Sequence, residues 1–158
     1  MRRLAAALTV VAALAACSGD GDDDAHLPDV TLEALDEGGA PLALVDLEGP
    51  AVLNLWATWC APCRAELPAF QEVSEARDDV RFIGVDIAED RSTARRFLDE
   101  LGVTFEQYVD DRGVLSDELG VASLPVTIVL DADGRISTSH IGPMDVADLE
   151  DALADAGA

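Results

Sequence analysis

The chain has 158 residues, of which 32 are acidic and 10 are basic, and its formal net charge at pH 7 is −22. A surface of this charge repels a phosphate backbone, and all ten basic residues are scattered arginines, so we expect no nucleic-acid partner. The length suits one domain with a single core. Three cysteines are too few for a scaffold held together by disulfides.

The first 17 residues have the features of an export signal. Arg2 and Arg3 precede an apolar run at residues 4–16 that contains no acidic side chain. The run is too short to span a bilayer comfortably. It ends in the letters LAAC at residues 14–17, which resemble the bacterial lipobox, and this resemblance implies that Cys17 is lipidated and anchors the protein on the extracytoplasmic face of the membrane. The alternative is an ordinary signal peptide with a chance cysteine.

A polar segment separates this signal from the rest of the chain. Residues 18–26 are rich in aspartate and glycine and have no large apolar side chain, which predicts a flexible acidic tether. Residues 27–158 form the predicted domain. It opens with two short strands at residues 30–35 and 41–44 that are joined by a glycine-containing turn, as in a hairpin.

After the hairpin, the pattern of apolar residues alternates between strands and helices. In chain order, we expect a buried strand at 51–56, a helix at 61–77, a buried strand at 80–87, helices at 92–101 and 114–119, a strand at 126–130, an edge strand at 135–140 and a helix at 146–156. Ser92 is the expected N-cap of the second helix, and Gly102 its end. This order predicts an α/β fold with a mixed central sheet covered by helices on both faces.

Cys60 and Cys63 form a C-x-x-C pair between a buried strand and the start of a helix. Free amide N–H groups and the positive end of the dipole at a helix N-terminus stabilise a thiolate, so Cys60 is the predicted attacking sulfur. Cys63 lies one turn later and is placed to resolve a mixed disulfide. The alternatives are half of a zinc site, for which further ligands are lacking, and a structural bridge, which would gain little stability from so small a loop. We therefore expect a redox-active disulfide and no cofactor or metal.

The sequence resembles the thioredoxin superfamily, and within it the TlpA/ResA/CcmG-like branch. The resemblance covers roughly residues 27–156 and is most specific at residues 54–68 (NLWATWCAPCRAELP) and 120–131 (GVASLPVTIVLD). It implies a four-stranded thioredoxin core with an added N-terminal hairpin. It also implies that Trp59 flanks the dithiol, that Pro125 is cis and faces it, and that the backbone of Leu124 binds an extended substrate segment.

The resemblance also raises the question of where protons go during exchange. Asn54 stands where cytoplasmic thioredoxins place a buried aspartate that assists proton transfer. Glu66 lies three residues after Cys63 on the same helical face, and the branch resembled has an acidic residue there, so Glu66 is the predicted substitute. The alternative is that Glu66 is one exposed acid among many.

The resemblance implies an enzyme, a thiol-disulfide oxidoreductase acting on exported proteins. In this branch the usual task is the reduction of apocytochrome c, with electrons supplied by a membrane thiol-transporting reductase of the CcdA type, and we expect a monomer. A thiol peroxidase of the peroxiredoxin group is a second possibility, which the cysteine spacing argues against. A Sco-like copper module using the two cysteines with His140 or Met144 is a third, although Sco proteins separate their cysteines by three residues.

Overall fold

The computed structural model of the chain describes residues 26–87 and 90–158. The predicted signal peptide, the lipidation site Cys17 and most of the predicted tether lie outside the described residues. The described elements are β1 (Thr31–Ala34), β2 (Leu42–Ala43), the 3-10 helix η1 (Leu44–Asp46), β3 (Ala51–Trp56), α1 (Ala61–Ala76), β4 (Arg81–Asp86), α2 (Arg91–Leu101), β5 (Glu106–Val109), α3 (Val114–Glu118), β6 (Val126–Leu130), β7 (Ile136–Ile141) and α4 (Val146–Asp155).

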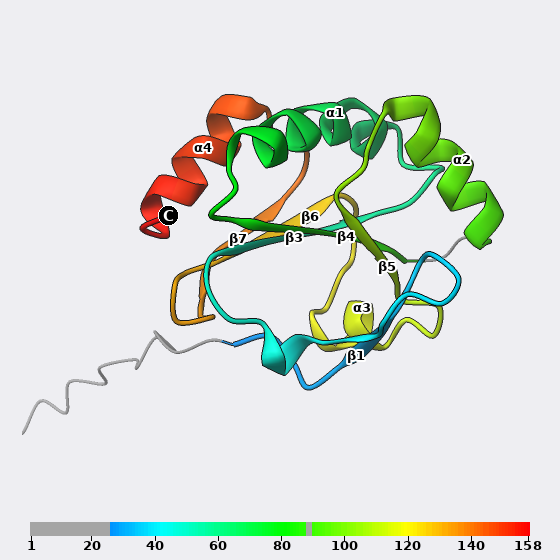
Figure 1. Cartoon of the computed structure of the whole chain (residues 1–158), viewed down its shortest axis with the longest axis horizontal. Coiled ribbons are helices and arrows are strands. Elements are labelled where there is room, and N and C mark those ends of the chain that lie inside the picture. Colours follow the sequence, from blue (N-terminus) through cyan, green and yellow to red (C-terminus); the bar gives the residue numbers. More distant parts are fainter. Residues whose placement is uncertain (1–25, 88–89) are drawn as a thin grey trace, which may run out of the picture.

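The strands form one mixed sheet in the order β2-β1-β5-β4-β3-β6-β7. Strands β3, β4 and β5 are parallel, while the flanking pairs are antiparallel. Helices α1, α2 and α4 cover one face of the sheet and α3 lies on the other (Figure 1). The expected α/β fold is confirmed. The four-stranded core that the resemblance implied consists of β4, β3, β6 and β7.

Strand β3 is buried along its whole length because both faces of the sheet are covered. Its side chains alternate between two cores, as the period of a strand requires. Leu53 and Leu55 belong to the apolar cluster that includes Leu115 of α3. Val52 and Trp56 point to the other face, where Trp56 stacks on Phe97 of α2 with ring centroids 5.3 Å apart. Because β3 is held between two cores, its end fixes the position of the dithiol segment that follows it.

Strand β5 was not predicted from the sequence, and it joins the hairpin to the core. It pairs in parallel with β4 on one side and antiparallel with β1 on the other. Its four residues, EQYV, are too few to show a clear periodicity, and Glu106 is exposed. The strand conformation of this segment follows from its two neighbours.

The expected cap of the second helix was wrong. Asp90, and not Ser92, is the N-cap of α2, because its carboxylate accepts hydrogen bonds from the backbone N–H groups of Ser92 and Thr93. The predicted end of this helix is confirmed, since Gly102 adopts a left-handed conformation with φ of +70°.

The described chain enters the domain at the end of the sheet opposite the dithiol. His26 forms an isolated antiparallel bridge with Arg135, just before β7. In the register of the sheet, the start of β7 lies beside the end of β6, where Leu130 pairs with Ala51 at the start of β3. The dithiol follows the other end of β3.

Candidate active site

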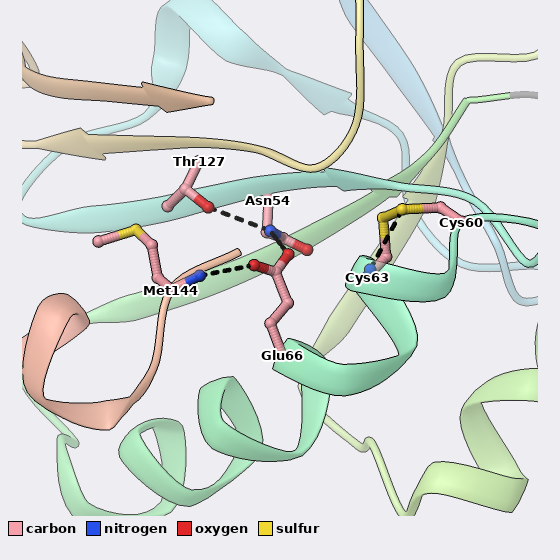
Figure 2. The surroundings of a disulfide bond; sticks show 6 residues. All are labelled: Asn54, Cys60, Cys63, Glu66, Thr127 and Met144. Atoms are coloured by element: carbon pink, nitrogen blue, oxygen red, sulfur yellow. Dashed lines mark hydrogen bonds between the residues drawn. A yellow bond between two sulfur atoms is a disulfide. The ribbon is translucent and has the colours of Figure 1, made fainter. Parts of the chain in front are cut away.

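The two cysteines form a disulfide at the N-terminus of α1, just beyond the end of β3 (Figure 2). Cys60 is the N-cap, and its Sγ accepts a hydrogen bond from the backbone N–H of Cys63 at 3.1 Å. Cys60 is 4% exposed and Cys63 is fully buried. A thiolate at Cys60 would keep this N–H donor and the positive end of the helix dipole, whereas Cys63 lies inside the first turn. The roles of the two sulfurs, Cys60 as the attacking and Cys63 as the resolving one, stay predictions.

The surroundings of the dithiol include an exposed aromatic ring and a cis peptide. Trp59, directly before Cys60, is 65% exposed. The Leu124–Pro125 peptide is cis, as the resemblance implied, and Leu124 packs against the cluster that contains both cysteines. Their roles in binding a substrate stay predictions.

Ile141 is an exposed apolar side chain at the same end of the sheet, which the sequence did not single out. It is the last residue of β7 and pairs with Val126, which directly follows Pro125. It is 65% exposed, as much as Trp59. Only the register between β6 and β7 brings Ile141 to this end of the sheet, so its position could not be derived from its local sequence.

Glu66 is buried beneath the dithiol, with 2% of its surface exposed, so the alternative of an exposed acid is wrong. Its Oε1 accepts a hydrogen bond from Nδ2 of Asn54 at 2.8 Å, and its Oε2 accepts one from the backbone N–H of Met144 at 3.1 Å (Figure 2). Asn54 Nδ2 also donates to Oγ1 of Thr127 at 3.2 Å. The carboxylate therefore lies where α1, β3, β6 and the segment before α4 meet.

The pKa of Glu66 is raised from 4.5 to about 7. Burial is the largest cause, because it disfavours the charged form, and the hydrogen bonds from Asn54 and Met144 lower the pKa by less than burial raises it. A carboxyl group with such a pKa accepts and releases protons near neutral pH. Asn54, which stands where cytoplasmic thioredoxins have an aspartate, is thus a direct hydrogen-bond partner of Glu66. Thr127 and Met144 were missed as parts of this network, since nothing local in the sequence connects them to Glu66.

His140 and Met144, the two residues considered as copper ligands beside the cysteines, differ in exposure. His140 is exposed on β7, whereas Met144 is 5% exposed and bonds Glu66 through its backbone. Within residues 26–87 and 90–158, no group of three or more His, Cys, Asp or Glu side chains is placed to hold a metal ion. Over the same residues, no helix is both long and apolar enough to cross a bilayer.

A thioredoxin-like fold with a C-x-x-C disulfide at a helix N-terminus defines the class of thiol-disulfide oxidoreductases. The model of the Redoxin family matches residues 22–153, and the chain belongs to this family.

The chain is similar to several curated relatives. It is 35% identical to the thioredoxin-like protein YneN of Bacillus subtilis over 131 residues, which cover 80% of this chain and 75% of the relative. It is 34% identical to the thiol:disulfide interchange protein DsbE of Vibrio cholerae over 130 residues, with 81% and 70% covered. It is 30% identical to the thiol-disulfide oxidoreductase ResA of Geobacillus thermodenitrificans over 129 residues, with 80% and 73% covered.

Solved structures of proteins from the same class have a similar fold. A secreted disulfide oxidoreductase of Mycobacterium tuberculosis, homologous to Escherichia coli DsbE, superposes with a TM-score of 0.72 at 28% identity, covering 80% of this chain and 95% of that one. A secreted thiol-disulfide isomerase of Corynebacterium glutamicum gives a TM-score of 0.74 at 27% identity, with 89% and 96% covered. The chain is therefore a thiol-disulfide oxidoreductase of the DsbE/ResA type that carries a Cys60–Cys63 pair.

Proposed function

We propose that this oxidoreductase works outside the cytoplasm as a lipid-anchored reductant of exported proteins. In this proposal, residues 1–17 are the signal peptide, Cys17 carries the lipid and residues 18–26 are the tether. The description of two structural relatives as secreted supports an extracytoplasmic location. The observation that carries the chemical part is the disulfide at the start of α1 above a buried Glu66.

The proposed reaction uses both sulfurs in order. The Cys60 thiolate attacks a substrate disulfide, forms a mixed disulfide and releases one substrate thiolate. The Cys63 thiol then gives its proton to Glu66 and attacks Sγ of Cys60. The Cys60–Cys63 disulfide forms, the second substrate thiolate leaves, and two electrons have passed to the substrate. Glu66 is the proposed proton acceptor, because its pKa of about 7 suits proton exchange near neutral pH.

The proposed substrate site lies at the dithiol end of the sheet. The exposed ring of Trp59 offers apolar contact area beside Cys60. The backbone at Leu124 and Pro125 would pair with an extended substrate segment. In the branch that the sequence resembles, this substrate is apocytochrome c and the electrons come from a membrane reductase of the CcdA type. We propose both partners for this chain.

The direction of electron flow is tested by the reduction potential of the Cys60–Cys63 couple. The expected result is a potential low enough for the reduced full chain to reduce oxidised apocytochrome c stoichiometrically. The Cys60→Ser variant is the matched control and should be inactive. If the wild type instead oxidises reduced apocytochrome c, the proposed reducing role is wrong.

The anchor is tested by fractionation of cells that produce the wild type or Cys17→Ser. We expect the wild type in the membrane fraction and the variant released or unprocessed. A wild type that fractionates as freely soluble would overturn the lipid anchor and leave the chemistry of the dithiol untouched.

A further inference from the structure

The carboxamide of Asn54 has one end fully engaged and the other end free. Its Nδ2 donates both of its hydrogen bonds, to Glu66 and to Thr127. Its Oδ1 is buried and has no hydrogen-bond partner among the residues that the structure describes. A buried acceptor without a donor is costly, and such exceptions often mark a functional role.

The present arrangement suits only one protonation state of Glu66. An ionised carboxylate accepts hydrogen bonds, and Glu66 here receives donors from Asn54 and Met144. A protonated carboxyl must also donate one. Half a turn of the Asn54 carboxamide would place Oδ1 where Nδ2 now lies and supply the acceptor. The Thr127 hydroxyl is both donor and acceptor, so it fits either orientation.

We propose that Asn54 is a positioning residue whose carboxamide turns over when Glu66 gains a proton, and that this turn links Glu66 to Cys63. The proposal rests on the proposed role of Glu66 as proton acceptor. Figure 2 shows the Asn54 oxygen on the side of the carboxamide that faces the disulfide. In the reduced enzyme, this oxygen would accept the S–H of Cys63 while Nδ2 holds the ionised Glu66.

The turn accompanies the proton from sulfur to carboxyl. When Cys63 gives its proton to Glu66, Oδ1 accepts the new O–H and Nδ2 faces the Cys63 thiolate as a donor. The thiolate then attacks Cys60 and closes the disulfide, and Glu66 later releases the proton to solvent. An aspartate at position 54 would have no N–H to donate to either partner.

Among the described residues, no charged side chain is a cause of the raised pKa of Glu66. The raised pKa of Glu66 comes from burial and from the bonds of Asn54 and Met144. The acids of α4 nearest in sequence to Met144 are Asp145 and Asp148, which are exposed and bind each other's backbone in the capping box.

An NMR titration of the oxidised full chain tests the turn directly. Above the Glu66 pKa, the side-chain amide protons of Asn54 should show contacts to Glu66 and Thr127. Below it, these contacts should weaken severalfold and contacts to Cys63 should replace them. The control Glu66→Gln should show no exchange with pH. Contacts to Glu66 that persist unchanged in the wild type, or the same exchange in the control, would overturn the proposal.

Kinetics supply a second measurement. Asn54→Ala should slow the closure of the mixed disulfide by Cys63 about tenfold or more, since a hydrogen bond to a charged group is lost, while the alkylation rate of Cys60 should change less than about twofold. Glu72→Gln, a change of an exposed residue on the same helix as Glu66, should match the wild type. If Asn54→Ala slows mixed-disulfide closure and Cys60 alkylation equally, Asn54 has only a structural role, and the proposed link between Glu66 and Cys63 is overturned. If Glu66→Gln exchanges at the wild-type rate, the proposed role of Glu66 fails, whereas the titration still decides whether Asn54 turns.

Discussion

Glu66→Gln should make the oxidised protein more stable at alkaline pH. The rise of the Glu66 pKa from 4.5 to about 7 is equivalent to about 3 kcal/mol of destabilisation when the carboxyl is charged. The unfolded chain ionises this group near 4.5 and the folded protein near 7. The destabilisation is therefore absent below about pH 4.5, grows as the pH rises and is complete above about pH 7.

The gain in the free energy of unfolding of Glu66→Gln should stay below about 3 kcal/mol. Glutamine keeps one acceptor oxygen, but its NH₂ group cannot accept the second bond that Glu66 now receives from Asn54 or Met144. We expect a gain of about 1–2 kcal/mol at pH 8, after a loss of about 1 kcal/mol for the mismatched donor.

Urea titrations of the oxidised wild type and Glu66→Gln at several pH values measure this effect. The difference between the two should change by at most about 1.4 kcal/mol per pH unit between pH 4.5 and 7, as one bound proton requires. Glu72→Gln is the matched control, because Glu72 is exposed on the same helix and should leave the pH profile unchanged. Parallel profiles for wild type and Glu66→Gln would refute the raised pKa.

Three further predictions concern the dithiol and the frame that holds it. Alkylation of the reduced full chain at mildly acidic pH should label Cys60 before Cys63, because Cys60 caps the helix and Cys63 is fully buried; peptide mapping reports the order, and the reverse order would exchange their roles. Gly84→Ala places a Cβ 2.1 Å from Oε1 of Gln107, so the Gln107 side chain must move away and lose the hydrogen bond that it accepts from Nε1 of Trp56; the free energy of unfolding should fall by about 1 kcal/mol in urea, and an unchanged value would contradict this reasoning. Asp145→Ala removes the capping box of α4 and should lower the melting temperature through a loss of about 1 kcal/mol, which calorimetry would detect or disprove.

The sequence predicted most elements because their signals are local. The continuous apolar run at residues 51–56 identified the central strand, and a helix starting next to it followed from Cys60, Pro62 and the periodicity behind them. Strand β5 was missed because its conformation depends on pairing with β4 and β1, which are distant in the chain.

The same distinction applies to the site. The spacing of Cys63 and Glu66 predicted that they share a helical face, and the structure places both in the interior. The hydrogen-bond network around Glu66 could not be predicted, because it includes Thr127 and Met144, which lie 61 and 78 residues further along the chain. Burial of a single carboxyl is a property of the assembled sheet and not of any motif.

The bridge between His26 and Arg135 places the N-terminal connection of the domain at the end of the sheet opposite the dithiol. Whatever is joined ahead of His26, whether a membrane, a sensor chip or a fused domain, is connected at one end of the sheet, while Cys60 lies at the other. The attachment point therefore does not obstruct the reactive sulfur. In such an arrangement, a second protein can approach the dithiol end of the sheet while the chain is held at the other end.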